Sequence, residues 1–419
     1  MKNKKLFRSL SKRIEARNDG EVADAIFGGN PDRNLYFGRI SAVCRVSEFL
    51  FLFAFIIFTV ISAILNAGSI TYDKAEYVIR NFAFRFEKNA DTTTEIIYTP
   101  DEMQSFALFG QGLAVSGNSG IRIFSATGRN TCRSDYSLSS SRLASSSKFA
   151  AVYEFGGREY LLFNSFARVG RGTSEQPILG MSVSDSGSYI IVCGDDEYAS
   201  SVLLYRSNFT LRSKFRKNSY VISSEISRDG GEILITTLDV NSSGQYISVI
   251  EKYEEDAEEP GVTVRLTGVF PYRCFFTDDG FGLLCKDRLM IYNRDGDLKK
   301  ELSFDGFEAV MFDSRGTACG VILKETGTGL SVNFHLRLIQ TAVGQAALEE
   351  RLDFVPTSLS VWGESAFLLS GGTVYEYRAD GSVRSADVSK RPEGSAVIAY
   401  AEGKAYLLCR SSAYVVDLD

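Results

Sequence analysis

The chain has 419 residues, with 30 Phe and 20 Tyr but only 7 Pro, a composition typical of a β-rich globular protein and unlike a long disordered stalk. Residues 1–48 hold 10 basic and 6 acidic side chains, so the 36 basic and 46 acidic side chains that follow carry the negative charge of the protein. A nucleic-acid-binding domain needs clustered positive charge on its folded body, so we expect no nucleic-acid partner.

The first predicted element is an apolar segment, "FLFLFAFIIFTVISAIL", from Phe49 to Leu65. The 24 positions between Glu48 and Asp73 hold no charged residue. As a helix they would span about 36 Å, which is enough to cross a hydrocarbon core about 30 Å thick. The alternative, a buried helix of a soluble protein, is difficult to accommodate in a β-rich chain. We therefore predict a transmembrane helix over residues 48–67.

The charge distribution around this segment predicts its orientation. Ten Lys and Arg residues precede it, and the positive-inside rule then places the N-terminus in the cytoplasm and the chain after about Gly68 outside. The long basic segment before the span, with no clean small-x-small cleavage site after it, favours an uncleaved signal anchor over a cleaved signal peptide. We expect a cytoplasmic basic tail at 1–47, a lipid bilayer around the helix, and an extracellular C-terminal domain in a single-pass protein of the cell membrane.

After the anchor, two kinds of hairpin alternate along the chain. One is a strand that ends in an aromatic residue and enters a turn built on Gly, Asp or Asn, as in "LMIYNRDGDL" from Leu289. The other is a strand that passes through an Asp/Gly turn into a second apolar strand, as in "MSVSDSGSYIIVC" from Met181. Two such hairpins in series predict a four-stranded antiparallel unit.

The spacing of the hairpins predicts the number of units. The aromatic residues that close the third strands are separated by 39, 42, 87 and 85 residues, and the last two intervals are close to twice the repeat. Strand-like sequence also occurs near positions 250 and 335 and in the final "AYVVDLD". The pattern predicts eight units of roughly forty residues, with seven as the alternative, and this is the period of propeller blades. The closing aromatic residues are Phe124, Phe163, Tyr205, Tyr292 and Tyr377.

A ring of such units would protect strand edges that a lone four-stranded sheet leaves exposed. The last unit has only three strands, so its fourth must come from elsewhere in the chain. The segment at 68–101 contains "AEYVIRNFAFRF" and "TTTEIIYTP" and could supply that strand, although a plain linker is the alternative. We predict an all-β fold with a β-propeller over residues 102–419.

The Asp-Gly turns, the apolar strands ending in Tyr and the single N-terminal span resemble membrane-anchored β-propellers of the WD-repeat-like and quinoprotein-like superfamily. The resemblance is strongest to an uncharacterised bacterial family, typical of clostridia and their relatives, in which one span precedes such a propeller. It covers most of the chain after about residue 48. The family is a domain of unknown function, so the resemblance implies no activity. The Trp-Asp dipeptide of WD repeats is missing, and Trp362 is the only tryptophan.

Motifs for catalysis or metal binding are scarce. The single histidine, His335, lies in a predicted strand and is interpreted as a packed or rim residue. The carboxylates of Asp185, Asp195–Glu197 and Asp278–Asp279 fall in predicted turns, where acidic residues favour the turn itself. The segment "NRDGDLKKE" has Asn293, Asp295 and Asp297 at alternating positions but lacks the Gly at the sixth and the Glu at the twelfth position of a calcium loop, so we interpret it as a hairpin turn. We assign no catalytic, cofactor or metal residues and expect no cofactor.

Six of the seven cysteines lie beyond the anchor, and most occur singly in predicted strands, where Cys behaves as a small buried hydrophobe. Cys274 and Cys285 are equidistant from the centre of "TDDGFG" and could face each other across a hairpin as a cross-strand disulfide. The acidic segment "YEEDAEEPG" falls in an extended loop. We interpret it as a solvated loop tip, with a contact to a divalent ion or a basic partner as the alternative.

These features favour a tethered extracytoplasmic module that binds or scaffolds an envelope protein, a wall polymer or polysaccharide, or a small ligand. The alternative is an extracytoplasmic hydrolase or lyase with its site in the central channel. Catalytic groups of a propeller enzyme come from different blades, so no local motif would reveal them.

Overall fold

The structure, a computed structural model, describes residues 46–47, 49–58, 95–101, 104–109, 112–125, 128–315, 317–326, 333–342 and 345–418. The chain forms two compact units, Met1–Phe84 and Arg85–Asp419. In the first unit residues 49–58 are helical. No helix among the described residues is both long and apolar enough to cross a membrane. All but two residues of the predicted tail, the rest of the predicted span and most of the predicted linker lie outside the described residues.

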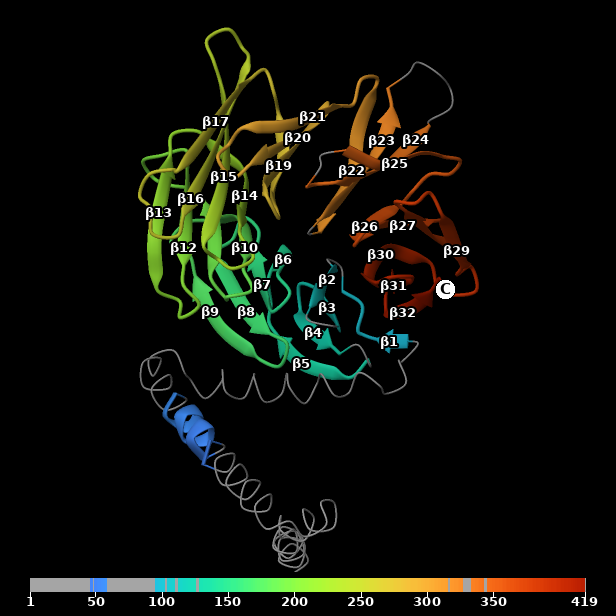
Figure 1. Cartoon of the computed structure of the whole chain (residues 1–419), viewed down its shortest axis with the longest axis horizontal. Coiled ribbons are helices and arrows are strands. Elements are labelled where there is room, and N and C mark those ends of the chain that lie inside the picture. Colours follow the sequence, from blue (N-terminus) through green and yellow to red (C-terminus); the bar gives the residue numbers. More distant parts are fainter. Residues whose placement is uncertain are drawn as a thin grey trace, which may run out of the picture. The chain divides into compact units, whose positions relative to one another are not determined.

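The second unit is a β-propeller of eight four-stranded antiparallel blades around a central axis (Figure 1). The sequence prediction of eight units is therefore confirmed, and the alternative of seven is wrong. In each blade we letter the strands A to D from the axis outward. Blades 1 to 4 are β2 (Ser105–Phe109), β3 (Gly112–Ser116), β4 (Gly120–Phe124) and β5 (Asn130–Asp135); β6 (Ser141–Ser145), β7 (Phe149–Glu154), β8 (Glu159–Asn164) and β9 (Arg168–Thr173); β10 (Ile178–Val183), β11 (Tyr189–Cys193), β12 (Ser200–Tyr205) and β13 (Leu211–Lys217); and β14 (Tyr220–Ile226), β15 (Glu232–Val240), β16 (Tyr246–Glu254) and β17 (Val262–Thr267).

The second half of the ring follows the same order of strands. Blades 5 to 8 are β18 (Pro271–Thr277), β19 (Gly280–Cys285), β20 (Arg288–Asn293) and β21 (Leu298–Ser303); β22 (Phe307–Arg315), β23 (Ala318–Glu325), β24 (Phe334–Gln340) and β25 (Gln345–Leu352); β26 (Ser358–Trp362), β27 (Ser365–Ser370), β28 (Thr373–Arg378) and β29 (Val383–Asp387); and β30 (Gly394–Ala401), β31 (Lys404–Cys409) and β32 (Ser412–Asp417) with β1 (Glu95–Ile97). One face of the ring carries the B–C and D–A connections, and we call it the DA face.

Blade 8 is completed by both ends of the propeller chain. Its A, B and C strands are the last three strands, and its D strand is β1, which pairs antiparallel with β32. Glu95 lies opposite Tyr414, and Ile97 lies opposite Ser412. The segment "TTTEIIYTP" thus contains the strand that joins the two ends of the ring.

Blades pack through one hydrophobic cluster at each of the eight junctions between neighbours. The clusters take alternate residues of the strands, because successive side chains of a strand point to opposite faces of a sheet. In β11, Tyr189, Ile191 and Cys193 pack toward blade 2, whereas Ile190 and Val192 pack toward blade 4. This explains why strands such as "YIIVC" are apolar at every position: both faces are buried.

The A strands present an unpaired edge to the axis, and neighbouring A strands are linked across that edge. Polar side chains of one A strand accept hydrogen bonds from backbone N–H groups of the next. Such links are made by Ser182 to Ile226 (3.4 Å), Ser223 to Cys274 (3.0 Å), Asp313 to Val361 (2.7 Å) and Ser360 to Ala399 (3.1 Å). Backbone donors that would otherwise be buried without partners are thereby satisfied.

Candidate functional site

Four charged side chains of the A strands form the channel cluster, which we define as Glu225 on β14, Arg273 on β18, and Asp313 and Arg315 on β22. They come from three successive blades. Each lies within six residues of its own A–B turn, so the strands bring together residues that are separated by up to 90 positions in the sequence. No local motif identifies such a group.

The two carboxyl groups of the channel cluster are held toward their neutral forms. Burial raises the pKa of Glu225, and Arg273 and the hydroxyl of Ser182 oppose that effect only in part. Burial likewise raises the pKa of Asp313, against the backbone N–H of Val361 and the charges of Arg315 and Arg273. Arg273 therefore acts electrostatically on both acids.

Arg315 is anchored by two further blades. Its Nη1 donates a hydrogen bond of 3.2 Å to the carbonyl oxygen of Ala399 in blade 8. Its guanidinium carbon lies 5.1 Å from the centre of the Trp362 ring in blade 7, a cation–π contact. Burial lowers the pKa of Arg315, and the charge of Asp313 opposes this shift. The Arg315 side chain thus joins the A strands of blades 6, 7 and 8.

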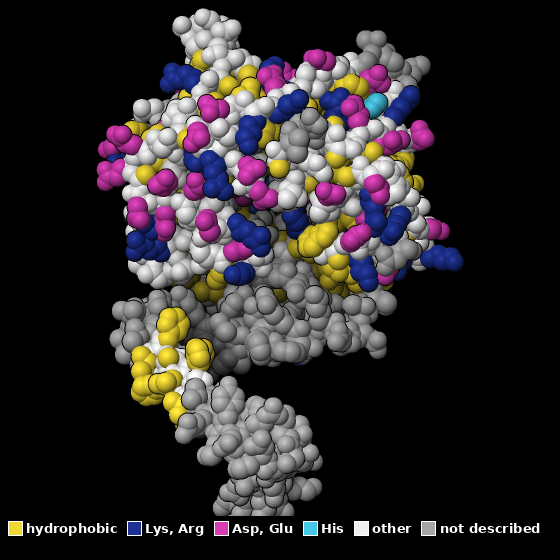
Figure 2. All heavy atoms as spheres, viewed as in Figure 1, with side chains coloured by type: hydrophobic (Ala, Val, Ile, Leu, Met, Phe, Trp, Pro, Cys, Tyr) yellow, Lys and Arg dark blue, Asp and Glu magenta, His cyan; other side chains and the backbone are white. Residues whose placement is uncertain are grey.

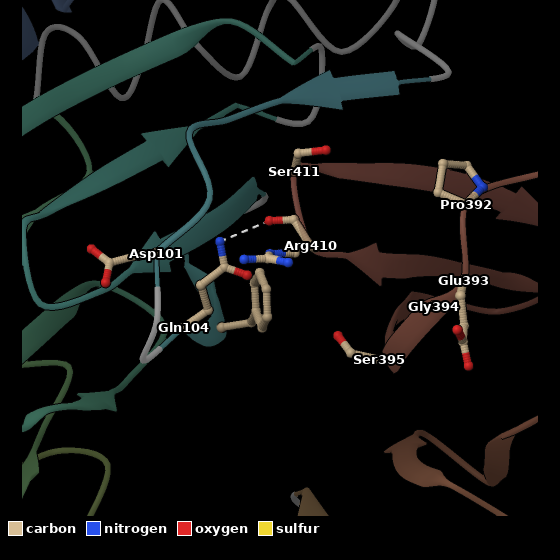
Figure 3. A pocket seen from close by; sticks show the side chains of 9 residues that line it. Asp101, Gln104, Pro392, Glu393, Gly394, Ser395, Arg410 and Ser411 are labelled. Carbon is tan, nitrogen blue, oxygen red and sulfur yellow. Dashed lines mark hydrogen bonds between the residues drawn. The ribbon is translucent and has the colours of Figure 1, made fainter.

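A pocket of about 850 Å³ opens on the DA face where blade 8 meets blade 1, and we call it the closure pocket (Figure 3). Its walls come from the β1–β2 connection and β2, from the start of β30, and from the turn between β31 and β32. Gln104 donates a hydrogen bond of 2.9 Å from Nε2 to the carbonyl oxygen of Arg410 across the junction. The residues that matter for its chemistry are Asp101, Gln104, Phe106, Glu393, Ser395 and Arg410.

A second surface of the DA face is aromatic. The register places Tyr220 opposite Leu238 and Val240 opposite Tyr246, so these side chains share the side of blade 4 that faces blade 5. Phe270, before β18, lies 5.3 Å from Tyr246 between ring centres, and Tyr272 lies 5.5 Å from Phe270. We call this group the aromatic patch: Tyr220, Val240, Tyr246, Phe270 and Tyr272.

The acidic residues singled out in the sequence lie in separate turns. Asp185, in the β10–β11 turn, accepts a hydrogen bond from Ser147 N (2.7 Å) and pairs with Arg228 Nε (2.7 Å), so it links the A–B turns of blades 2, 3 and 4. Burial alone would raise the pKa of Asp185, but the bonds from Arg228, Ser147 and Ser146 outweigh it and lower the pKa below its ordinary value. This carboxylate is structural.

Two other acidic groups also have local structural partners. A hydrogen bond from Ser201 and a salt bridge from Lys214 hold the pKa of Asp195 well below its ordinary value. In the "YEEDAEEPG" segment, Glu255 and Asp256 pair with Arg212 of blade 3. The loop-tip interpretation is thus incomplete, because part of the loop is fixed to its neighbour. Glu258 and Glu259 are exposed.

The remaining sequence predictions concern single residues and one turn. His335 lies on β24 with its ring 4.8 Å from that of Phe307. Asn293 Oδ1 accepts hydrogen bonds from the N–H groups of Asp295 and Asp297, and Gly296 adopts a φ of 88°. This is the geometry of a hairpin turn, as interpreted from the sequence. Among the residues described by the structure, no group of three or more His, Cys, Asp and Glu could hold a metal ion.

The expected facing of Cys274 and Cys285 is wrong. The β18–β19 hairpin turns at Asp278–Asp279, so Cys274 lies opposite Leu283, and a shift in register places Cys285 opposite Pro271. Both thiols are free and buried. Burial raises the pKa of Cys274 to about 11 and that of Cys285 to about 12, so both behave as inert hydrophobic groups.

Charged side chains of both signs are mixed over the surface seen in Figure 2, with smaller apolar areas between them. Comparison with solved structures finds chains of similar fold. Saccharomyces cerevisiae Sqt1 superposes with a TM-score of 0.55 at 12% identity, over 78% of this chain and 98% of that one. The Neurospora crassa Pan2 WD40 domain gives a TM-score of 0.44 at 9% identity, covering 67% of this chain and 88% of that one. The dihydro-heme d1 dehydrogenase NirN gives 0.48 at 12% identity, with 70% and 69% covered.

At this identity, the likeness to Sqt1 shows the fold alone. No curated protein matches the chain. A family model does match, over residues 87–413, which include nearly the whole propeller from β1 onward. The chain belongs to a family of unknown function, DUF5711, whose matched region is here an eight-bladed β-propeller.

Proposed function

We propose that this protein is a membrane-tethered extracytoplasmic propeller that binds a protein of the cell envelope and acts as a scaffold for it. The observation that carries the proposal is the aromatic patch on the DA face. Tyr220 is 70% exposed, and Val240, Tyr246 and Tyr272 are 54%, 44% and 43% exposed. Exposed aromatic side chains gathered in one place are characteristic of protein interfaces, where Tyr is enriched among the residues that dominate affinity.

The tether in this proposal rests on the sequence. The uncharged segment after Glu48 is long enough to cross a bilayer, and ten basic residues precede it. A partner of the propeller would then be met outside the membrane.

Cysteine labelling in intact cells tests the orientation. The variant Ser243→Cys places a thiol in an exposed turn of blade 4, and Ser9→Cys places one in the basic tail. A membrane-impermeant maleimide should label Ser243→Cys in intact cells and Ser9→Cys only after permeabilisation. The opposite pattern would place the propeller in the cytoplasm and end the extracytoplasmic part of the proposal.

Capture of partners tests the binding function. The full chain, solubilised in detergent, is used as bait in envelope extracts, beside the triple variant Tyr220→Ser, Tyr246→Ser, Tyr272→Ser. A matched control replaces three exposed apolar residues of D strands in other blades: Val169→Ser, Leu211→Ser, Val383→Ser. We expect a discrete partner that the native chain and the control retain and the tyrosine variant loses. Equal capture by all three proteins would show that the aromatic patch is not the interface.

A second candidate function, a hydrolase or lyase, is favoured by the channel cluster. Glu225 and Asp313 have raised pKa values beside arginine side chains, and shifts of this kind are frequent in active sites, although structural ion networks show them too. A catalytic role predicts that Asp313→Asn abolishes turnover of any substrate the protein acts on while partner capture is retained. Loss of both together would indicate a structural carboxylate.

A further inference from the structure

We propose that the closure pocket is a saccharide-binding site that takes a neutral sugar segment through Arg410, Glu393, Gln104 and Ser395. It is a site distinct from the aromatic patch. The pocket joins the two ends of the ring, because Asp101 and Gln104 precede β2, whereas Glu393 and Ser395 lie at the start of blade 8. Asp101 and Gln104 line one side, Glu393 and Ser395 the other, and Arg410 lies between them (Figure 3).

Internal hydrogen bonds orient some polar groups of the pocket and leave others available. Asp101 Oδ2 accepts hydrogen bonds from the N–H (2.9 Å) and the hydroxyl (2.6 Å) of Ser119. The Gln104 amide is held through its Nε2 on the backbone of Arg410, which leaves its oxygen as an acceptor. Ser395 Oγ donates to the carbonyl oxygen of Leu408 (3.1 Å) and can still accept.

Arg410 and Glu393 are the charged groups of the pocket that remain for a ligand. Both are exposed, and neither forms an ion pair with any residue that the structure describes. The guanidinium offers up to five N–H donors in a fixed plane, and the carboxylate offers only acceptors. A ligand matched to this pair must accept at one point and donate at another.

Sugar hydroxyls meet that requirement, because each hydroxyl is both donor and acceptor. Neighbouring hydroxyls could accept from Arg410 and donate to Glu393, while Phe106 supplies the apolar surface against which the C–H face of a sugar ring can pack. Asp101, Glu393 and Arg410 together carry one net negative charge, which disfavours an anionic ligand. The volume of about 850 Å³ is within the range of ligand sites and holds more than one sugar ring.

Occupancy would also affect the ring. A saccharide in contact with both walls would link the β1–β2 connection to the β30–β32 part of blade 8. These two ends of the ring are held together by strand pairing between β1 and β32 and by hydrogen bonds, not by a covalent connection. A ligand that binds only the folded state raises its stability by mass action, so binding should raise the midpoint of thermal unfolding. If the extracytoplasmic location proposed above holds, envelope polysaccharides would be the source of the ligand.

Isothermal titration calorimetry of the full chain tests the site. The detergent should have a polyoxyethylene headgroup, because a sugar-based detergent would compete for the pocket. The probes are N,N′,N″-triacetylchitotriose and cellotriose as neutral sugars, trigalacturonate as an anion, and triglycine as a zwitterion. We expect a saturable heat of binding with at least one of the two neutral trisaccharides and no heat of binding with trigalacturonate or triglycine. Binding confined to triglycine or trigalacturonate, or no binding of neutral sugars, would overturn the proposal.

Variants locate the binding in the pocket. Arg410→Ala should weaken the affinity for the sugar about 10- to 100-fold, the usual effect of losing a charged hydrogen bond, and Ser395→Ala should weaken it less. Arg410→Ala keeps the bond from Gln104, which uses the main-chain oxygen. The matched control is Arg265→Ala, an exposed arginine on β17 in blade 4. Unchanged affinity for the sugar in both pocket variants would show that the sugar binds elsewhere. The triple tyrosine variant of the aromatic patch should still bind the sugar, which separates the outcome of this test from that of the proposed scaffold function.

Discussion

Tyr98, directly after β1, forms hydrogen bonds between the two ends of the ring. Its hydroxyl lies 2.5 Å from the carbonyl oxygen of Cys409 and 2.8 Å from that of Ser412, and its N–H donates to the carbonyl oxygen of Ser411 (2.9 Å). Burial of the phenol raises its pKa well above the ordinary value, with the Cys409 thiol as a smaller cause. The hydroxyl therefore stays protonated and able to donate at physiological pH.

We predict that Tyr98→Phe lowers the free energy of unfolding by about 1–3 kcal/mol, because the buried carbonyl oxygens of Cys409 and Ser412 lose their donor. Urea unfolding followed by circular dichroism measures the change. Tyr246→Phe, at an exposed site of the aromatic patch, should change stability by less than about 0.5 kcal/mol. Equal effects of the two variants would show that the Tyr98 hydroxyl bonds do not stabilise the closure.

We predict that the raised pKa of Glu225 makes the free energy of unfolding depend on pH. Because burial raises its pKa in the folded state, the folded protein binds this proton more tightly than the unfolded chain does. Its contribution to stability is therefore fully present below the unfolded pKa and is lost as the pH rises through the raised folded pKa. The Glu225→Gln variant carries a neutral side chain at every pH, so it does not lose this contribution. Its stability relative to the native protein should therefore increase from about pH 4 to pH 8, by about 1.4 kcal/mol for each unit by which the folded pKa is raised. Parallel curves of stability against pH for the two proteins would contradict the raised pKa.

At the residue scale, the sequence predicted turn residues well and buried partners poorly. The Asn293 turn depends on its own neighbours, so its pattern identified it. The channel cluster depends on three A strands brought side by side. A charged residue shortly before an A–B turn, as with Glu225 and Asp313, is a signal that could have pointed to its members one by one, although not to their proximity. The facing of Cys274 and Cys285 failed because a tight turn and a shift in register moved the pairing.

At the scale of the element, the three-residue strand β1 completes blade 8 and closes the ring. Its middle residue, Ile96, is 2% exposed and packs in the cluster between blades 8 and 1, whereas Ile97 is 73% exposed. The outer edge of β32 would be unpaired without this strand. Three residues thus complete a sheet whose other strands begin about 300 positions later in the sequence.

The two neighbouring isoleucines give a matched test of this closure. Ile96→Asp places a charge in the cluster and should lower the free energy of unfolding by about 3 kcal/mol or more, whereas Ile97→Asp should lie within about 1 kcal/mol of the native protein. Limited proteolysis should cut the C-terminal strands of blade 8 sooner in the first variant only. Similar resistance of both variants would mean that the ring holds without β1.

Strand positions were predictable because each hairpin repeats its own pattern. The third strands expected near 250 and 335 are β16 and β24, although β24 ends in Ile339 and Gln340 without an aromatic residue there. The register within each blade was not predictable, since irregularities such as the one between Ala309 and Met311 depend on packing against neighbouring blades.

At the scale of the whole propeller, the eight hydrophobic clusters form a closed series, because every pair of neighbouring blades shares one of them and no blade stands at an end. An open array of repeats can unfold from one end because each unit contacts only its neighbours. A closed ring has no end, so loss of one junction also removes the constraint that holds the others. This arrangement predicts that the blades unfold together.

Trp362, the only tryptophan, gives a local probe of blade 7 for this prediction. Leu161, 1% exposed, packs in the cluster between blades 1 and 2, and Leu161→Ala should lower the free energy of unfolding by about 2–5 kcal/mol. In urea unfolding, the midpoints of Trp362 fluorescence and of far-ultraviolet circular dichroism should shift together in this variant, although the substitution lies in a different part of the ring. The exposed substitution Phe155→Ser in blade 2 should shift neither midpoint appreciably. If the fluorescence midpoint stays fixed while the circular dichroism midpoint falls, the blades unfold separately, and closure of the ring does not couple them.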